Sequence, residues 1–188
     1  MDKLIKLNLG CGQVRLPGFI GVDDNPNAIA ADVVHNLNSF PYPFGDNSTK
    51  EILMEHILEH TESPIKVLIE LYRVSADGAM ITVRSPHFSC NWLHPGHRSA
   101  ISTMLFDYFN QDTTDFYGKC NFKVNSIKLR WLKPNGPHSW FPKIMGGVID
   151  IFANLNVGLC QRVWCYWVGG FEEIEFKVAV AKATARKA

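Results

Sequence analysis

The sequence predicts an α/β fold with an open sheet whose strands end in polar residues. Three observations support this prediction. An apolar run at 4–9 stops at two glycines, and a second run at 19–23 stops at an acid. A helical pattern that begins at Ser63 separates two further apolar runs. Short apolar runs that alternate with a helical pattern are typical of βαβ units.

The first run, Leu4 to Leu9, leads into Gly10-Cys11-Gly12. Glycine allows a positive φ and lets another group approach the main chain closely. Ligands of open α/β sheets bind at the carboxyl ends of the strands. The stretch therefore predicts a nucleotide-type site, with an ordinary turn as the alternative.

The second run ends at Asp23, which is placed to accept hydrogen bonds from the hydroxyls of a ribose. Arg15 stands where the third glycine of a Gly-x-Gly-x-x-Gly motif would be, which argues against NAD and FAD. Residues 13–18 are too few for a full helix between the two strands.

Four motifs occur in a characteristic order along the chain: Leu7–Gly12, Gly21–Asp23, Pro41–Ser48 and Glu55–His60. In these motifs the sequence resembles small class I S-adenosylmethionine (SAM)-dependent methyltransferases of the compact bacterial or phage type, which are methyltransferase-11-like. The resemblance covers residues 1–188 as a single domain, is dense up to Phe88 and is thin after Trp131.

The resemblance implies a Rossmann-like, doubly wound sheet that is mostly parallel, with an antiparallel last strand and shortened first helices. Ser63 and Pro64 are typical of a helix start, and Gly78 is expected to end this helix. The expected third to seventh strands are 31–35, 51–56, 80–84, 122–132 and 173–180.

The resemblance also implies SAM as the cofactor. Asn8, Gly10, Cys11 and Gly12 would border its methionine part, and Asp23 would hold its ribose. A redox role is the alternative for Cys11.

Further along the chain, Asn36 and Leu37 would frame the adenine, and Glu55 would lie near the sulfur. For Asn36, capping of its own turn is the alternative.

The candidate catalytic residues are His56, His87 and His97, because imidazole titrates near neutral pH and can take a proton from an acceptor. The alternative is that these histidines hold loops by hydrogen bonds. We expect no metal site. The spacing of His87, Cys90, His94 and His97 nevertheless permits a zinc site as a lesser alternative.

Composition excludes several functions. The net charge of +1 carries no basic excess, so we expect no nucleic-acid partner. Five cysteines without a Cys-x-x-Cys motif indicate free thiols in the cytoplasm.

No apolar run is long enough to cross a bilayer. The segment 148–171 comes closest, and it reads as an amphipathic helix and an aromatic turn, with a peripheral membrane contact as the lesser alternative. Core packing is expected for most of the five tryptophans.

The predicted function is methyl transfer to a small-molecule or glycan-type acceptor. The alternative is a non-catalytic module that binds SAM or S-adenosylhomocysteine (SAH), or a partner, on the same fold. A homodimer is a further expectation, because the short first connection leaves one side of the cofactor site thinly covered.

Overall fold

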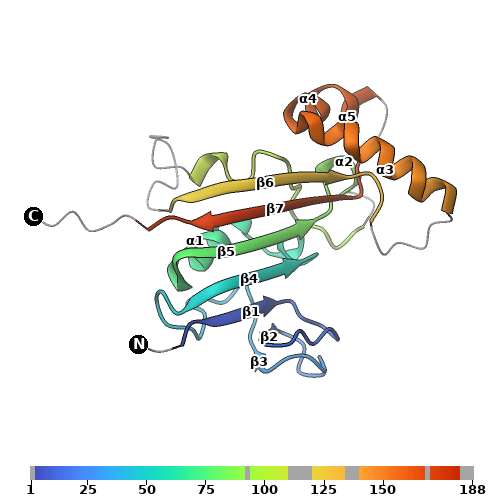
Figure 1. The fold of residues 1–188 in the computed structure, drawn as a ribbon. Coiled ribbons are helices and arrows are strands. Elements are labelled where there is room, and N and C mark those ends of the chain that lie inside the picture. Colours follow the sequence, from blue (N-terminus) through green and yellow to red (C-terminus); the bar gives the residue numbers. More distant parts are fainter. Residues whose placement is uncertain (1–2, 92–93, 110–119, 134–139, 168–169, 183–188) are drawn as a thin grey trace, which may run out of the picture.

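The computed structural model describes residues 3–91, 94–109, 120–133, 140–167 and 170–182. These residues form one seven-stranded sheet with the strand order β3-β2-β1-β4-β5-β7-β6 (Figure 1). The strands are β1 Ile5–Leu9, β2 Ile20–Asp23, β3 Val33–Val34, β4 Thr49–Glu55, β5 Ser75–Ser85, β6 Phe122–Arg130 and β7 Glu173–Val180.

The first five strands pair in parallel, and β7 runs antiparallel to both β5 and β6. The mostly parallel sheet with an antiparallel β7 is therefore confirmed, and β7 has the predicted bounds. β3 is shorter than expected, because only Val33 and Val34 pair with β2.

Helix α1, Pro64–Val74, connects β4 to β5 and begins as expected: the Ser63 hydroxyl accepts the N–H of Lys66. The predicted helix stop at Gly78 is wrong. The helix ends at Val74, and Gly78, with φ of +75°, lies inside β5. Its positive φ falls where the pairing of β5 with β4 shifts in register, so this glycine serves a bulge.

The connections on either side of β2 contain turns in place of helices. Arg15 holds them together: its guanidinium donates to Asp32 Oδ1 at 2.9 Å and to the carbonyl oxygen of Ile29 at 3.2 Å. Asp32 Oδ2 accepts the N–H of Gly21 at 2.8 Å. This main-chain bond and Arg15 lower the pKa of Asp32.

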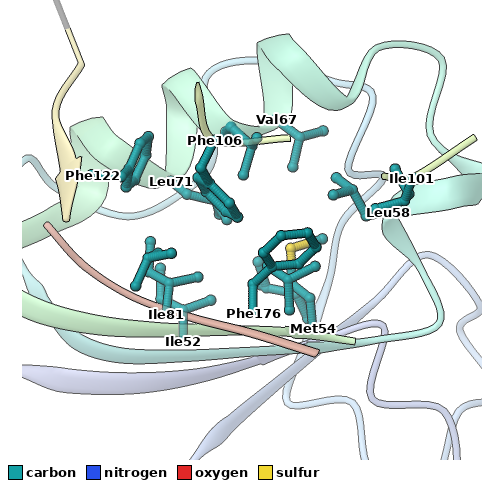
Figure 2. Packing of buried hydrophobic residues seen from close by; sticks show 14 of the residues in the cluster. Ile52, Met54, Leu58, Val67, Leu71, Ile81, Ile101, Phe106, Phe122 and Phe176 are labelled. Carbon is teal, nitrogen blue, oxygen red and sulfur yellow. The ribbon is translucent and has the colours of Figure 1, made fainter. Parts of the chain in front are cut away.

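The core lies between α1 and one face of the sheet (Figure 2). Side chains from β4, β5 and β7 face Val67 and Leu71 of α1. Phe106 fills the space between them, with its ring centroid 5.4 Å from that of Phe122 and 5.2 Å from that of Phe176. The 3-10 turns η1, Leu58–His60, and η2, Asp107–Phe109, and the short helix α2, Phe88–Asn91, lie along the connections.

The opposite face of the sheet carries charged residues in cross-strand rows. Figure 1 shows α1 behind the sheet, so the viewer looks onto this face. Glu55 on β4 lies opposite Arg84 on β5, which lies opposite Glu175 on β7. Arg84 forms ion pairs with both carboxylates, and such opposite-charge neighbours stabilise a sheet.

Three helices lie between β6 and β7 in the sequence, beside the edge strand β6 (Figure 1). They are α3 Trp140–Leu155, α4 Val157–Arg162 and α5 Trp164–Trp167. We call them the helical insertion. Among the described residues no single helix has the length and apolarity to cross a membrane. The segments Trp140–Leu155 and Val157–Trp167 meet that test only together, and they are bent by 106°.

Two polar side chains of α3 bind the free edge of β6. Asn154 accepts the N–H of Leu129 and donates to its carbonyl oxygen, both at 2.8 Å. Asp150, one helical turn earlier, accepts the N–H of Trp131 at 2.7 Å. One turn of helix rises about 5.4 Å, and two strand residues span about 6.6 Å. The spacing of Asp150 and Asn154 along α3 therefore matches the spacing of Trp131 and Leu129 along β6. These contacts occupy main-chain groups that would otherwise leave an open sheet edge.

The expectation that core packing accounts for most tryptophans is wrong for the helical insertion. Trp140 is 73% exposed and Trp167 is 85% exposed, and Trp164 is also exposed. Trp131 is half-buried against the core. Trp92 lies outside the described residues.

We predict that Asn154→Ala destabilises the protein by about 1–3 kcal/mol, because it leaves the N–H and carbonyl oxygen of Leu129 without these partners. The melting temperature should fall by about 2–4 °C per kcal/mol. The control is Asn125→Ala, which removes an exposed amide from β6, the strand that Asn154 binds. Equal melting temperatures for the two variants in calorimetry would contradict the prediction.

Candidate functional site

The candidate site lies where β1, β2, β4 and β5 end and β7 begins. Gly10 and Cys11 both donate their N–H groups to the carbonyl oxygen of Val22, at 2.8 and 3.1 Å. Gly10 has φ of +70° and Gly12 has φ of +51°. The turn after β1 is thus folded back onto the end of β2.

The two glycines of this turn have different surroundings. A Cβ on Gly10 would lie 2.7 Å from Cγ1 of Ile57, so the protein's own side chain packs on this glycine. A Cβ on Gly12 would meet no atom within 4 Å. Main chain that a ligand can approach is therefore found at Gly12 rather than at Gly10.

Asp23 lies at the tip of β2 and links the two turns. Its Oδ2 accepts the N–H of Gly12 at 2.8 Å, and its Oδ1 accepts the N–H of Asn25 at 3.0 Å. Each carboxylate oxygen has two lone-pair sites, so each retains one for a further donor. The side chain is half-buried.

Asn8 and Cys11 support the same turn from inside. Asn8 is buried, and its amide donates to the carbonyl oxygen of Val14 at 3.3 Å. Burial, followed by the nearby Asp23 carboxylate, raises the pKa of the buried Cys11 thiol. A protonated thiol is a poor nucleophile, so the surroundings of Cys11 do not favour its redox alternative.

The predicted adenine contacts follow β3. Asn36 is exposed, and its Oδ1 accepts the N–H of Asn38 at 2.8 Å, which is the turn-capping arrangement. Leu37 is buried in the core, and its carbonyl oxygen accepts the hydroxyl of Tyr42 at 2.9 Å. The Asn36 amide retains its N–H₂ donors and one lone pair for a ligand.

The ends of β4 and β5 join the start of β7 through an ionic network that the sequence analysis did not identify. Glu55 pairs with Arg84, which donates to Glu175 Oε2 at 2.6 Å. Arg130 lies 3.2 Å from Glu173 Oε1, an ion-pair distance. Glu173 and Glu175 are buried, so their charges depend on these arginines.

His56 follows Glu55 with φ of +53° and lies between two buried carboxylates. Its Nε2 is 3.0 Å from Glu173 Oε2, and its Nδ1 is 3.5 Å from Glu59 Oε1. The bond to Glu173, together with Glu59, raises the pKa of His56 to about 9. At neutral pH this ring is an imidazolium, which donates hydrogen bonds and cannot take a proton.

Glu59 is fully buried. Burial alone would raise its pKa, but the neighbouring His56 and the hydrogen bond that the Ser85 hydroxyl donates, at 2.6 Å, bring the pKa below its ordinary value. Glu59 is therefore, after Glu173, the second charged partner that keeps His56 protonated.

His87 has the opposite character. It is fully buried, with Nδ1 2.7 Å from the Ser89 hydroxyl and Nε2 3.4 Å from Gln161 Oε1. Burial lowers its pKa to about 4. A neutral ring bound on both nitrogens favours the loop-pinning alternative: His87 joins the tip of β5 to α4.

His97 lies with two other histidines. Its ring centroid is 4.8 Å from that of His60 and 4.7 Å from that of His94. The four-residue zinc alternative is not assembled, because His87 uses its nitrogens elsewhere. His60 takes its place beside His94 and His97.

Some of the missed residues left a signal in the sequence. Glu173 and Glu175 alternate with apolar Ile174 and Phe176, so they necessarily share the non-core face of β7. Their pairing with Arg84 and Arg130 required the strand order. No pattern in the sequence indicated that His60 would approach a loop from beyond β5.

No protein-family model matches this sequence, and no curated protein matches it. Many solved structures do match in fold. A SAM-dependent methyltransferase from Archaeoglobus fulgidus aligns over 94% of this chain and 86% of its own, with a TM-score of 0.53 and 14% identity. A methyltransferase from Haloferax volcanii, complexed with the Trm112 methyltransferase activator, aligns over 95% and 83%, with a TM-score of 0.59 and 15% identity.

A third solved structure, the [4+2]-cyclase SpnF, aligns over 97% of this chain and 77% of its own, with a TM-score of 0.56 and 15% identity. At such identities the agreement is one of fold. The expected class I methyltransferase fold is confirmed, and the chemistry has to be argued from the site.

We predict that His56→Gln loses stability in a pH-dependent way. Because folding raises the pKa of His56 from 6.5 to about 9, the stabilisation is complete below pH 6.5 and disappears as the pH rises through about 9. Its upper limit is about 3.5 kcal/mol, from about 1.4 kcal/mol per pKa unit.

Urea unfolding of both proteins from pH 6 to 10 measures this difference, and His35→Gln controls for the loss of a histidine elsewhere. If the difference in the free energy of unfolding between wild type and His56→Gln stays constant with pH, His56 is not charged in the way proposed.

Proposed function

We propose that this protein transfers the methyl group of SAM to a small-molecule or glycan-type acceptor. Asp23 is the observation that carries the proposal. Its carboxylate lies at the tip of β2, is fixed by the N–H groups of Gly12 and Asn25, and keeps acceptor capacity on both oxygens. A ribose with two vicinal hydroxyls is the natural donor for such a carboxylate.

The surrounding residues fit the rest of the cofactor to different degrees. Gly12 offers main chain without an obstructing side chain, which suits the amino-acid end. Asn36 offers amide donors to the adenine. Glu55 is about 40% exposed beside Arg84, so its carboxylate is available near a positively charged sulfur. Ile57, which packs on Gly10, limits access from the side of η1.

When bound, SAM supplies an electrophilic methyl group on a sulfonium. The protein then has to hold an acceptor atom in line with that group and exclude water. The imidazolium of His56 is suited to orienting an acceptor oxygen as a hydrogen-bond donor, and His87 is suited to holding the β5 loop. Among the three histidines proposed as catalytic, His56 is the donor between two carboxylates and His87 is fully buried, so half-buried His97 is the candidate base.

A non-catalytic module remains the second candidate function, and two observations favour it. Asn36 Oδ1 is used by its own turn, and Ile57 occupies the space beside Gly10. SpnF, described as a cyclase, also shows that one fold serves different chemistries. This candidate predicts that SAH binds without turnover on any acceptor, or does not bind.

We place the protein in the cytoplasm, where its cysteines, all free thiols among the described residues, stay reduced. A homodimer would cover the cofactor edge that the short β1–β2 connection leaves open.

We predict that SAH binds and that Asp23→Asn weakens its binding by roughly tenfold to a hundredfold, because hydrogen bonds to a charged group contribute about 1.5–3 kcal/mol. Isothermal calorimetry measures this change, and circular dichroism checks the fold. Asp24→Asn is the matched control, since Asp24 is the exposed neighbour.

Two results would count against the cofactor site. One is the absence of heat with both SAM and SAH. The other is an Asp23→Asn variant that binds as tightly as Asp24→Asn. Release of SAH during incubation with sugar and small-molecule acceptors then separates the enzyme from the binding module.

A further inference from the structure

Three histidines from two separate segments meet at the carboxyl edge of the sheet. His60 ends η1, which follows β4, and His94 and His97 lie in the connection that follows β5 and α2. One ring nitrogen from each lies within 4.8 Å of the others. His60 and His97 are half-buried, and His94 is exposed, so the cluster faces outward at one corner.

The main chain fixes this arrangement independently of any ligand. The N–H groups of Arg98 and Ser99 both donate to the carbonyl oxygen of Glu59, at 2.8 and 3.3 Å. Gly96 permits the close approach, because a Cβ there would lie 3.0 Å from Cε1 of His94 and 3.7 Å from Nδ1 of His60. The turn 94–97 is thereby held against η1.

Hydrogen bonds also set the state of two rings. His60 Nδ1 lies 3.1 Å from the carbonyl oxygen of Gly96 and therefore donates, which leaves the lone pair of Nε2 for a ligand. A main-chain carbonyl oxygen often accepts the N–H of a histidine whose other ring nitrogen binds a metal. His94 Nδ1 accepts the N–H of Gly96 at 3.1 Å, so the free lone pair of this ring is on Nδ1. A metal ion would bind that lone pair and replace the N–H of Gly96.

We propose that His60, His94 and His97 bind one divalent transition-metal ion. Zinc suits three imidazole ligands best. Three histidines around zinc leave a fourth position for water or an oxygen ligand. At Zn–N distances of about 2.0–2.1 Å the nitrogens stand about 3.3 Å apart. Small rotations of the side chains from the present spacing would reach this geometry.

Metal binding by the three histidines does not depend on the methyltransferase proposal, but a bound ion would matter for methyl transfer. An ion at this edge, beside the ends of β4 and β5, would offer an acceptor hydroxyl a Lewis acid in place of a protein base. That consequence rests on the proposed function, whereas metal binding does not, and the experiment measures metal binding alone.

The test uses full-length protein without an affinity tag, stripped with a chelator and titrated with Zn²⁺ by calorimetry and with Co²⁺ by visible absorption. We expect one equivalent to bind, with the absorption of tetrahedral cobalt. His60→Ala, His94→Ala and His97→Ala should each weaken binding at least about tenfold, and His35→Ala should leave it unchanged.

Wild type that binds no stoichiometric metal would overturn the site. Binding that is unchanged in any of the three variants would overturn the three-histidine ligand set, as would an equal loss in His35→Ala. Thermal melts of the metal-free variants show whether each is folded, and a folded variant without metal binding supports the site.

A second observation, independent of the first, concerns the helical insertion. The two sides of α3 have the reverse of the usual arrangement. The polar residues Asp150 and Asn154 face β6, and the apolar residues face solvent. The exposed apolar residues of the insertion are Trp140, Phe141, Ile144, Met145, Val148, Ile151, Phe152, Leu155, Leu159, Val163, Trp164, Tyr166 and Trp167. A continuous patch of this kind marks an interaction surface.

The character of this surface indicates what covers it. Both exposed charged residues of the insertion, Lys143 and Arg162, are basic, and its only acid, Asp150, is half-buried on the inner side. Tryptophan and tyrosine together with basic residues are typical of helices that lie in a membrane interface. An apolar cavity of about 520 Å³ opens on the same surface, lined by residues that include Phe152, Leu155 and Trp167.

We infer that the helical insertion docks on the surface of an anionic lipid membrane, with its apolar face in the acyl boundary. Helix α3 carries its exposed apolar residues on one side, so it is suited to lying flat on a bilayer. A second copy is less well matched, because it offers no exposed acid from its own insertion to the basic residues Lys143 and Arg162.

Co-sedimentation with vesicles of equal parts phosphatidylglycerol and phosphatidylcholine tests this inference. We expect wild type to bind these vesicles and to bind pure phosphatidylcholine more weakly. Phe152→Asp combined with Leu155→Asp, at positions 70% and 76% exposed, should reduce binding at least about tenfold. Ile29→Asp, at a position 77% exposed, is the matched control.

Three results would overturn membrane docking. They are no vesicle binding by wild type, equal binding by the double variant and wild type, and a wild-type dimer in ultracentrifugation that the double variant dissociates. The last result would assign the surface to a second copy of the chain.

Discussion

The shortness of the connection between β1 and β2 constrains the rest of the molecule. Six residues between Gly12 and Phe19 cannot form a crossover helix, so the chain passes from one parallel strand to the next through a turn. The turn needs other support, and it obtains it from carboxylates. Asp23 binds the N–H of Gly12 and Asp32 binds the N–H of Gly21. The residue proposed to hold the ribose is therefore also a structural support of the site's main chain.

The two faces of the sheet differ in charge. The core lies against α1, and the face that looks away from α1 is stabilised by rows of opposite charges on neighbouring strands. Burial of Glu173 and Glu175 is tolerated because Arg84, Arg130 and His56 neutralise them. The network lies at the carboxyl edge, so it ties the strands together where the proposed cofactor and acceptor would meet.

The three histidines considered as catalysts show what a sequence determines and what it leaves open. His56, His87 and His97 were equivalent as residue types. The fold protonates the first through buried carboxylates, deprotonates the second by burial, and gathers the third with two other rings. The strands were predictable because apolar runs and glycines are local signals. The state of a histidine depends on partners such as Glu173, which is 117 residues from His56 along the chain.

The position of the helical insertion links the outer surface to the site. Gln161 of α4 bonds His87 at the tip of β5 and accepts the N–H of Thr103 at 2.8 Å. Movement of the insertion would therefore displace the loop that follows β5. The same connection carries His94 and His97 further along. A surface that covers the apolar face of α3 would therefore act on the loop that holds the proposed metal ligands.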